Sequence, residues 1–374
     1  MKAKIALIIF SIFILTGGCI TPFMPDIEEN QDLLVVEGLI TDQPEANTVR
    51  LSISMPLGQR LSATPVSGAV VSIFDDLGKV YNLVESKKGT YQTNPSTFRG
   101  VAGRKYRLHI KTKGTSTNYY NYESVPMEMK PVPRIDSIYY EKVVISGPDL
   151  YSGLPKEGCQ IYLDAEDKEN NCRFFRWNYT ETWEFRIPFE VPNNRCWVSE
   201  ASSNINIKST SALAQSRINR FPIRYVSNST DRLKVKYSIL IQQYSLSEDE
   251  FIFWDKMKNI YENVGSLYDM IPAAIPGNIY CVENPKEKVL GYFSVSATTT
   301  KRIFIKDNFF GQADPYRYCI TDTIWGGGQI PGLNSYVWIL YDHSFPPPAY
   351  RVITDNKGCA DCTVRGTKTK PAYW

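Results

Sequence analysis

The sequence predicts a mainly β protein, and three observations lead to that class. Short runs of β-branched and aromatic residues alternate with Gly, Pro, Asn and Asp turn signals along most of the chain. The 24 Tyr, 17 Phe and 7 Trp form a 13% aromatic share, which favours sheets. One segment alone has strong helical periodicity. We therefore expect a β-sandwich near the N-terminus, followed by a larger β-rich domain with one amphipathic helix.

Residues 1–18 have the parts of a secretory signal peptide. Lys2 and Lys4 precede an apolar run over residues 5–15, which is shorter than the roughly 20 residues of a membrane span. Cys19 follows two glycines, at the place where a bacterial lipoprotein receives a diacylglyceryl group on its new N-terminus. Leu15 stands one position farther from the cysteine than is usual. The alternative is an ordinary cleaved signal, and we expect lipid attachment at Cys19.

The next segment, residues 19–32, has two prolines, four acids and little apolar periodicity, which is typical of a tether. The 42 basic and 39 acidic residues are interspersed along the chain, and no long basic tract occurs. This pattern disfavours nucleic acid as a partner. No second apolar run is long enough to span a membrane, so the lipid is the expected membrane attachment.

Residues 33–133 are predicted to form the first sandwich. Within residues 48–54, Val49, Leu51 and Ile53 alternate with polar residues, as in a strand with one buried face. The expected strands are 33–40, 48–54, 68–76, 79–85, 89–94, 103–113 and 119–129. The order "GAVVSIFDD", "GTYQ", "GRKYRLHI" resembles the prealbumin-like or carboxypeptidase-regulatory (Ig-like) sandwich. Such modules usually serve as spacers or adhesive units.

Two closely spaced prolines in residues 130–137 indicate a linker, so we assign residues 134–374 to the second, β-rich domain. Its expected strands are 136–145, 159–167, 172–188, 232–244, 289–297, 301–307 and 335–342.

A helix is predicted over residues 248–264. Ser247 and Glu250 have the spacing of a capping box, and Gly265 suits a C-cap. The apolar residues at helical spacing are Phe253, Met257, Ile260 and Val264. We expect this face to pack against a sheet rather than to bind a partner.

The cysteines indicate an oxidising compartment. Without Cys19, seven remain, and all follow residue 150: Cys159, Cys172, Cys196, Cys281, Cys319, Cys359 and Cys362. At most three bridges are available, with a pairing that the sequence leaves open. The "CADC" motif suits a redox pair, half of a zinc site or a disulfide. The chain has no second C-x-x-C for zinc and no thioredoxin-like flanks. We expect structural disulfides here, within the motif or to distant cysteines.

No catalytic motif is present. The two histidines, His109 and His343, lie in no nucleophile motif, and the sequence has no zinc-protease, P-loop or dinucleotide fingerprint. The glycine-rich residues 325–332 suggest a surface loop. The acids Asp164, Glu166, Asp167 and Glu169 favour a charged hairpin turn over a calcium site or a glycosidase pair. We expect no enzyme activity, no metal and no cofactor other than the lipid on Cys19.

Several blocks together resemble a known family. They include "LLVVEGLITDQPEANTVRLSIS", "PVSGAVVSIFDDLGKVYNLVE", "VKYSILIQQYSLSEDEFIFWDKMK" and the ending "CADCTVRGTKTKPAYW". Over about residues 25–374 the chain is similar to the Bacteroidota lipoproteins labelled domain of unknown function 4249. The resemblance implies an outer-membrane lipoprotein of a kind often encoded beside TonB-dependent receptors, and it carries over no catalytic residue.

The predicted function is that of an accessory or partner subunit of a TonB-dependent transporter or another outer-membrane barrel complex. An alternative is a surface glycan- or nutrient-binding lipoprotein that uses exposed aromatic residues, and a third is a hydrolase acting through the acids near Asp164. We expect the cell surface rather than the periplasmic face. Ser137 and Thr323 lie in three-residue patterns of O-glycosylation, which is consistent with export.

Overall fold

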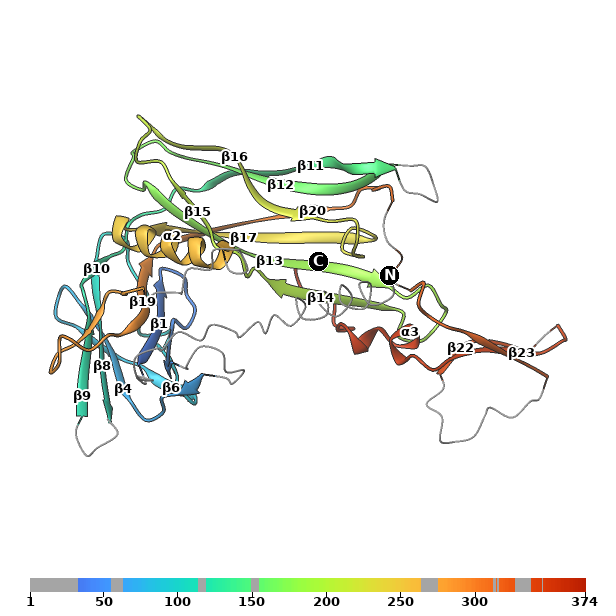
Figure 1. The fold of residues 1–374 in the computed structure, drawn as a ribbon, viewed down its shortest axis with the longest axis horizontal. Helices are drawn as coiled ribbons and strands as arrows, with labels where there is room; N and C mark the ends of the chain where they lie inside the picture. The colour runs from blue at the N-terminus through green and yellow to red at the C-terminus, as the bar shows by residue number, and fades with distance from the viewer. Residues whose placement is uncertain are drawn as a thin grey trace, which may run out of the picture.

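The computed structural model describes residues 33–54, 63–113, 119–148, 155–263, 275–311, 314, 316–326, 338–344 and 346–374. The signal peptide, Cys19 and the tether predicted for residues 19–32 lie outside these residues. The described chain forms two sandwich-like pairs of sheets, a long helix at their junction and a three-stranded arm (Figure 1). None of its helices has the length and apolar character needed to cross a membrane. The mainly β prediction is confirmed.

The N-terminal sandwich consists of sheets A and B. In spatial order, sheet A contains β19 (Leu290–Ser296), β1 (Leu34–Thr41), β2 (Thr48–Ile53), β7 (Thr90–Gln92) and β6 (Val84–Lys87), with β3 (Thr64–Pro65) on β2. Sheet B contains β18 (Ile279–Cys281), β9 (Tyr119–Ser124), β8 (Lys105–Lys113), β4 (Val70–Asp75) and β5 (Val80–Asn82), with β10 (Met127–Glu128) on β8. Alternate residues such as Val36, Leu51, Ile73 and Leu108 fill the space between the sheets. The strands predicted between residues 33 and 129 are present.

Both N-terminal sheets are completed by strands that come much later in the chain. β19 pairs in parallel with β1, and β18 pairs with β9. Gly291 lies opposite Val36, with a φ of +87°, and a Cβ there would approach the Val36 carbonyl oxygen to 2.1 Å. Only glycine fits this close parallel approach. Residues 279–296 therefore contribute to the sandwich that the sequence assigned to residues 33–133.

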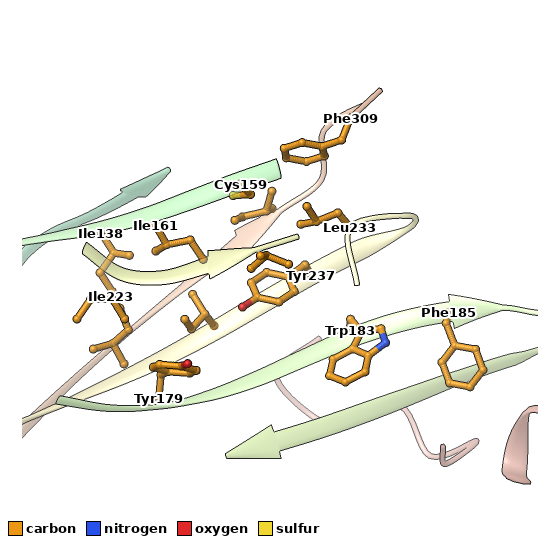
Figure 2. Packing of buried hydrophobic residues seen from close by; sticks show 14 of the residues in the cluster. Ile138, Cys159, Ile161, Tyr179, Trp183, Phe185, Ile223, Leu233, Tyr237 and Phe309 are labelled. Atoms are coloured by element: carbon orange, nitrogen blue, oxygen red, sulfur yellow. The ribbon is translucent and has the colours of Figure 1, made fainter. Parts of the chain in front are cut away.

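The C-terminal sandwich consists of sheets C and D. Sheet C has the order β11 (Ile135–Pro148), β12 (Pro155–Asp167) and β16 (Ser216–Val226). Sheet D has the order β14 (Arg195–Ala201), β13 (Phe174–Arg186), β17 (Lys236–Leu246) and β20 (Thr298–Ile305), with β15 (Asn206–Ser209) on β13. Figure 2 shows Ile161 and Ile223 of sheet C directed toward Tyr179 and Tyr237 of sheet D. This shared apolar layer joins the two sheets.

Strand β13 presents opposite chemistry on its two faces because successive side chains alternate. Its odd-numbered residues, including Trp177 and Trp183, face the core between sheets C and D. Its even-numbered residues face the other way, and Arg176 and Glu184 are nevertheless 7% and 2% exposed. We call this second side the outer face of sheet D. Its buried charges require cover from elsewhere in the chain.

One cover is helix α2 (Glu248–Asn263), which confirms the helix predicted over 248–264. The Ser247 hydroxyl accepts the amide N–H of Glu250 at 3.2 Å, as an N-cap residue does. Glu250 does not complete the capping box, because its side chain is fully buried and accepts a hydrogen bond from Trp254 Nε1. The ring of Phe253 lies 4.7 Å from that of Tyr292 in sheet A. The helix thus packs between the two sandwiches (Figure 1).

The arm is a three-stranded sheet of β21 (Asp322–Trp325), β23 (Tyr350–Thr354) and β22 (Trp338–His343). It extends away from the sandwiches, with α3 (Lys357–Ala360) and η1 (Cys362–Val364) at its base (Figure 1). The C-terminal tail then returns to the outer face of sheet D. There, Trp374 Nε1 donates to Glu184 Oε2 at 3.3 Å, and the hydroxyl of Tyr373 is 2.9 Å from that of Thr182.

Candidate functional site

The arm has a row of four aromatic side chains, of which Trp325 and Tyr341 are exposed and His343 and Tyr350 are half-buried. Tyr350 is the cross-strand neighbour of both Trp325 and His343, and Tyr341 lies two residues before His343 on the same face. The ring centroid of Tyr350 lies 5.1 Å from the ring centroid of Trp325, 5.7 Å from that of Tyr341 and 5.0 Å from that of His343. Trp325 is 61% exposed. We call Trp325, Tyr341, His343 and Tyr350 the aromatic row.

Rings packed on one another in this way present a preorganised amphipathic surface. Contiguous exposed apolar groups mark contact sites more often than single exposed residues do. Tyr and Trp are the residues most enriched at the energetic centres of protein interfaces. The aromatic row is therefore a surface on which a partner would gain contact free energy.

Two disulfides fasten the base of the arm. Cys319 bonds to Cys359, with Cα atoms 5.9 Å apart, and Cys196 of β14 bonds to Cys362, with Cα atoms 5.7 Å apart. The two cysteines of "CADC" therefore pair with distant partners, which was one of the two pairings left open by the sequence. Cys362 also ties the segment after the arm to the edge of sheet D. The bridges restrict how the arm can move relative to the body.

The other three cysteines, Cys159, Cys172 and Cys281, are buried free thiols. Burial raises the pKa of Cys159 to about 12 and that of Cys172 to about 12. Burial also raises the pKa of Cys281. Because the thiolate is the reactive form, these cysteines act as small apolar core residues.

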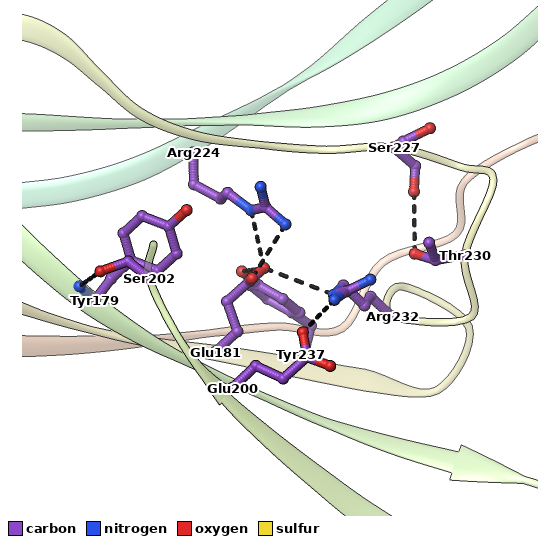
Figure 3. A network of polar contacts seen from close by, with 9 residues as sticks. All are labelled: Tyr179, Glu181, Glu200, Ser202, Arg224, Ser227, Thr230, Arg232 and Tyr237. Carbon is purple, nitrogen blue, oxygen red and sulfur yellow. Dashed lines mark hydrogen bonds and ion pairs between the residues drawn. The ribbon is translucent and has the colours of Figure 1, made fainter. Parts of the chain in front are cut away.

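A buried ionic network lies between sheets C and D. Figure 3 shows Glu181 of β13 facing Arg224, Arg232 and Tyr237. Arg224 Nε and the Tyr237 hydroxyl donate to Glu181 Oε1 at 3.1 and 2.7 Å. Arg232 Nε lies 3.9 Å from the same oxygen. Since each charge has a partner, we interpret the network as a structural connection between the sheets.

The acids singled out by the sequence have local structural roles. Asp167 Oδ2 accepts the Cys172 amide at 2.7 Å and so closes the turn between β12 and β13. The predicted hairpin is wrong here, because this turn carries the chain from sheet C to sheet D and its two strands do not pair. Asp164 accepts hydrogen bonds from the Ser137 hydroxyl and the Arg220 amide. No cluster of three metal-ligating side chains occurs within the described ranges.

The remaining predicted residues are scattered. His109 lies in β8, with its ring 5.9 Å from that of Phe74, far along the chain from His343 in the arm. Of the two glycosylation patterns, Ser137 is half-buried and Thr323 in β21 is exposed. Most of the glycine-rich residues 325–332, like Cys19, lie outside the described residues.

The sequence signals for the aromatic row were incomplete. Residues 335–342 were predicted as a strand, but the partner strands β21 and β23 were not predicted. Tyr350 touches three rings only because these strands pair, so the row cannot be seen in any one segment.

The chain matches one family model, described as domain of unknown function DUF4249, over residues 20–302. The match spans both sandwiches and α2 and ends before the arm. None of the curated proteins compared with the chain matches it.

Proposed function

Because the chain belongs to the DUF4249 family and begins with a signal of the lipoprotein type, we propose that it is a non-catalytic partner subunit of a TonB-dependent transporter. Another outer-membrane barrel complex is the broader form of the same proposal. A lipid on Cys19 would hold the protein at the membrane, with the folded body on the cell surface.

The aromatic row carries this proposal. A subunit that acts by contact needs an exposed apolar surface held in a defined orientation, and the row combines exposed Trp325 and Tyr341 with a disulfide-fastened base. The family match covers residues 20–302 and does not include the arm.

Co-purification tests the partnership. We expect a barrel protein to co-purify with the native chain from detergent-solubilised envelopes of its host. A Trp325→Ser/Tyr341→Ser variant should recover at least tenfold less barrel protein, because two anchors of the contact are removed. The matched control is Tyr225→Ser/Tyr261→Ser, which alters two exposed tyrosines outside the arm. If no barrel protein co-purifies with the native chain, the proposal is overturned. If the arm variant recovers as much barrel protein as the native chain does, the aromatic row is not the contact.

The lipid anchor has its own test. The native chain should take up a palmitate probe and remain with membranes, whereas Cys19→Ala should do neither. A Cys19→Ala chain that still partitions with membranes would contradict the anchor. Protease treatment of intact cells then distinguishes surface exposure from the periplasmic face.

Glycan binding is the second candidate, because the exposed ring of Trp325 is also suited to stacking on a sugar. Affinity electrophoresis in gels containing polysaccharide separates the two proposals. A retarded native chain whose mobility is restored by Trp325→Ser would favour the glycan, and an unretarded chain would favour the protein partner.

A further inference from the structure

A cavity of about 840 Å³ lies at the junction of the two sandwiches and α2. Its volume is within the range of pockets that enclose small molecules. It is separate from the arm and uses none of the residues of the aromatic row. Three walls form it: the outward face of sheet A, one face of α2 and the end of the outer face of sheet D.

The secondary structure explains why these side chains converge. Val35, Glu37 and Leu39 of β1 face the cavity, while the intervening Leu34 and Val36 fill the sandwich core. From α2, Phe253, Trp254, Met257 and Ile260 line it at helical spacing. The apolar stripe predicted from the sequence therefore faces a sheet and, in the same place, an open volume.

Arg176 of β13 forms part of the cavity wall and is only 7% exposed. Its guanidinium carbon lies 4.2 Å from the ring centroid of Trp254 and 4.8 Å from that of Tyr244. Its Nε has no hydrogen-bond acceptor, and no carboxylate of the described residues forms an ion pair with it. Proteins normally pair a buried charge, so this guanidinium is an exception.

The nearby carboxyl group of Glu250 forms no ion pair with Arg176 within 4.0 Å. Glu250 is fully buried, and its Oε2 has no donor in the described part of the chain. Burial raises the pKa of Glu250 above its usual value of 4.5, although the charge of Arg176 lowers it. Arginine stays protonated in proteins, so the cavity wall carries a positive charge that no ion pair of the described residues neutralises.

A second unpaired donor faces the same volume. Asn47 is 5% exposed, and its Oδ1 accepts the Thr41 amide at 2.7 Å, which fixes the orientation of the side-chain amide. Its Nδ2 has no acceptor among the described residues. Both Arg176 and Asn47 line the cavity, so it offers hydrogen-bond donors without matching acceptors.

We propose that this cavity binds a monocarboxylate with an apolar body, whose carboxylate pairs with Arg176. The guanidinium fork matches a carboxylate in geometry and in charge. Leu39, Met257 and Ile260 supply apolar contact for the rest of the ligand. The wall also has one exposed cation, Arg50, which lies opposite Glu37 in the sheet, and two exposed carboxylates, Glu37 and Glu45. These three side chains add no net positive charge, which disfavours a doubly charged group such as phosphate. The ligand is a free apolar acid or the C-terminal carboxylate of a short apolar peptide.

Calorimetry with three matched probes tests the proposal: 4-phenylbutyrate, its amide and phenyl phosphate. The native chain should bind the acid at least tenfold more tightly than the amide or the phosphate, because only the acid supplies a single anion. Equal binding of acid and amide, tighter binding of the phosphate, or no binding at millimolar concentration would overturn it. An apolar tripeptide and its C-terminal amide distinguish a peptide source from a free acid.

Variants locate the site. Arg176→Met should weaken the binding of 4-phenylbutyrate at least tenfold and leave the affinity for its amide unchanged. Arg302→Met is the matched control, since Arg302 stacks on Tyr373 on the same face of sheet D but outside the cavity. Met257→Trp should prevent binding of both 4-phenylbutyrate and its amide, because the larger side chain fills the cavity. This variant also tests the site if Arg176→Met does not fold. An acid preference that survives in Arg176→Met places the ligand elsewhere and contradicts the proposal.

Discussion

The two faces of β13 bury charged residues in opposite ways. On the inner face, Glu181 is surrounded by Arg224, Arg232 and the Tyr237 hydroxyl (Figure 3). On the outer face, Arg176 lies against the rings of Tyr244 and Trp254, and it forms no ion pair with any of the described residues. Both residues are less than 8% exposed. Burial alone therefore does not distinguish structural charges from charges available to a ligand, whereas pairing does.

The two faces also differ in how they are closed. The inner face meets sheet C through an apolar layer made by the strands themselves (Figure 2). The outer face depends on α2 at one end and on the C-terminal tail at the other. The cavity beside Arg176 lies at the end that α2 covers, where sheet A forms its remaining wall.

The largest expected effect concerns the disulfide between Cys196 and Cys362, which ties the segment after the arm to the edge of sheet D. Replacing Cys196 and Cys362 by Ser should lower the free energy of unfolding by about 4 kcal/mol, because the bridge closes a loop across a separation of 166 residues. The control is Cys319→Ser/Cys359→Ser, with a separation of 40 residues and a loss smaller by about 1 kcal/mol. Urea unfolding without reductant measures both. Equal losses would contradict the dependence on loop length.

The inner network should respond next. Glu181→Gln leaves Arg224 without a counter-charge and leaves Arg232 with Glu200 alone, so we expect a loss of about 3 kcal/mol of unfolding free energy. Glu200→Gln, which alters the half-exposed partner of Arg232, should cost less than about 1 kcal/mol. Urea denaturation at pH 7 compares the two. Similar losses would mean that Glu181 is not a buried anchor.

Arg176→Met should behave in the opposite way. Since Arg176 forms no ion pair within the described residues that the substitution would break, the free energy of unfolding should stay within about 1 kcal/mol of the native value or rise. Arg224→Met should lose about 3 kcal/mol, because Glu181 stays buried without its main partner. Parallel urea curves at pH 7 compare the two arginines. A large loss for Arg176→Met would show that the guanidinium is structural after all.

The smallest effect is a pH dependence at Glu250. Burial raises its folded-state pKa above 4.5, so on raising the pH the unfolded chain loses this proton first and stability falls. Glu250→Gln removes that contribution. The variant should match the native chain below pH 4.5 and become the more stable of the two as the pH rises toward 7. Urea midpoints across this range measure the difference, and a constant difference would exclude titration of Glu250.

Local signals predicted local elements well. The helix over Glu248–Asn263 followed from Ser247 and the apolar spacing after it, because caps and periodicity act within a few residues. The "CADC" motif indicated disulfides but left their partners open. The strands β14, β16, β21 and β23 were not predicted. Neither was the return of β18 and β19 to the first sandwich, because pairing between distant segments leaves no local pattern.

The sequence by itself determined the β class, the helix and its apolar stripe. It also determined that alternate residues of β1, and of β13, lie on opposite faces of the strand, because strand and helix periods are properties of the backbone. Only the tertiary structure decided the disulfide partners, the aromatic row and the burial of Arg176. An arginine on the outward face of a strand is expected to be solvated. Arg176 became an unpaired buried charge because α2, more than 70 residues later in the chain, packs its Trp254 over the guanidinium.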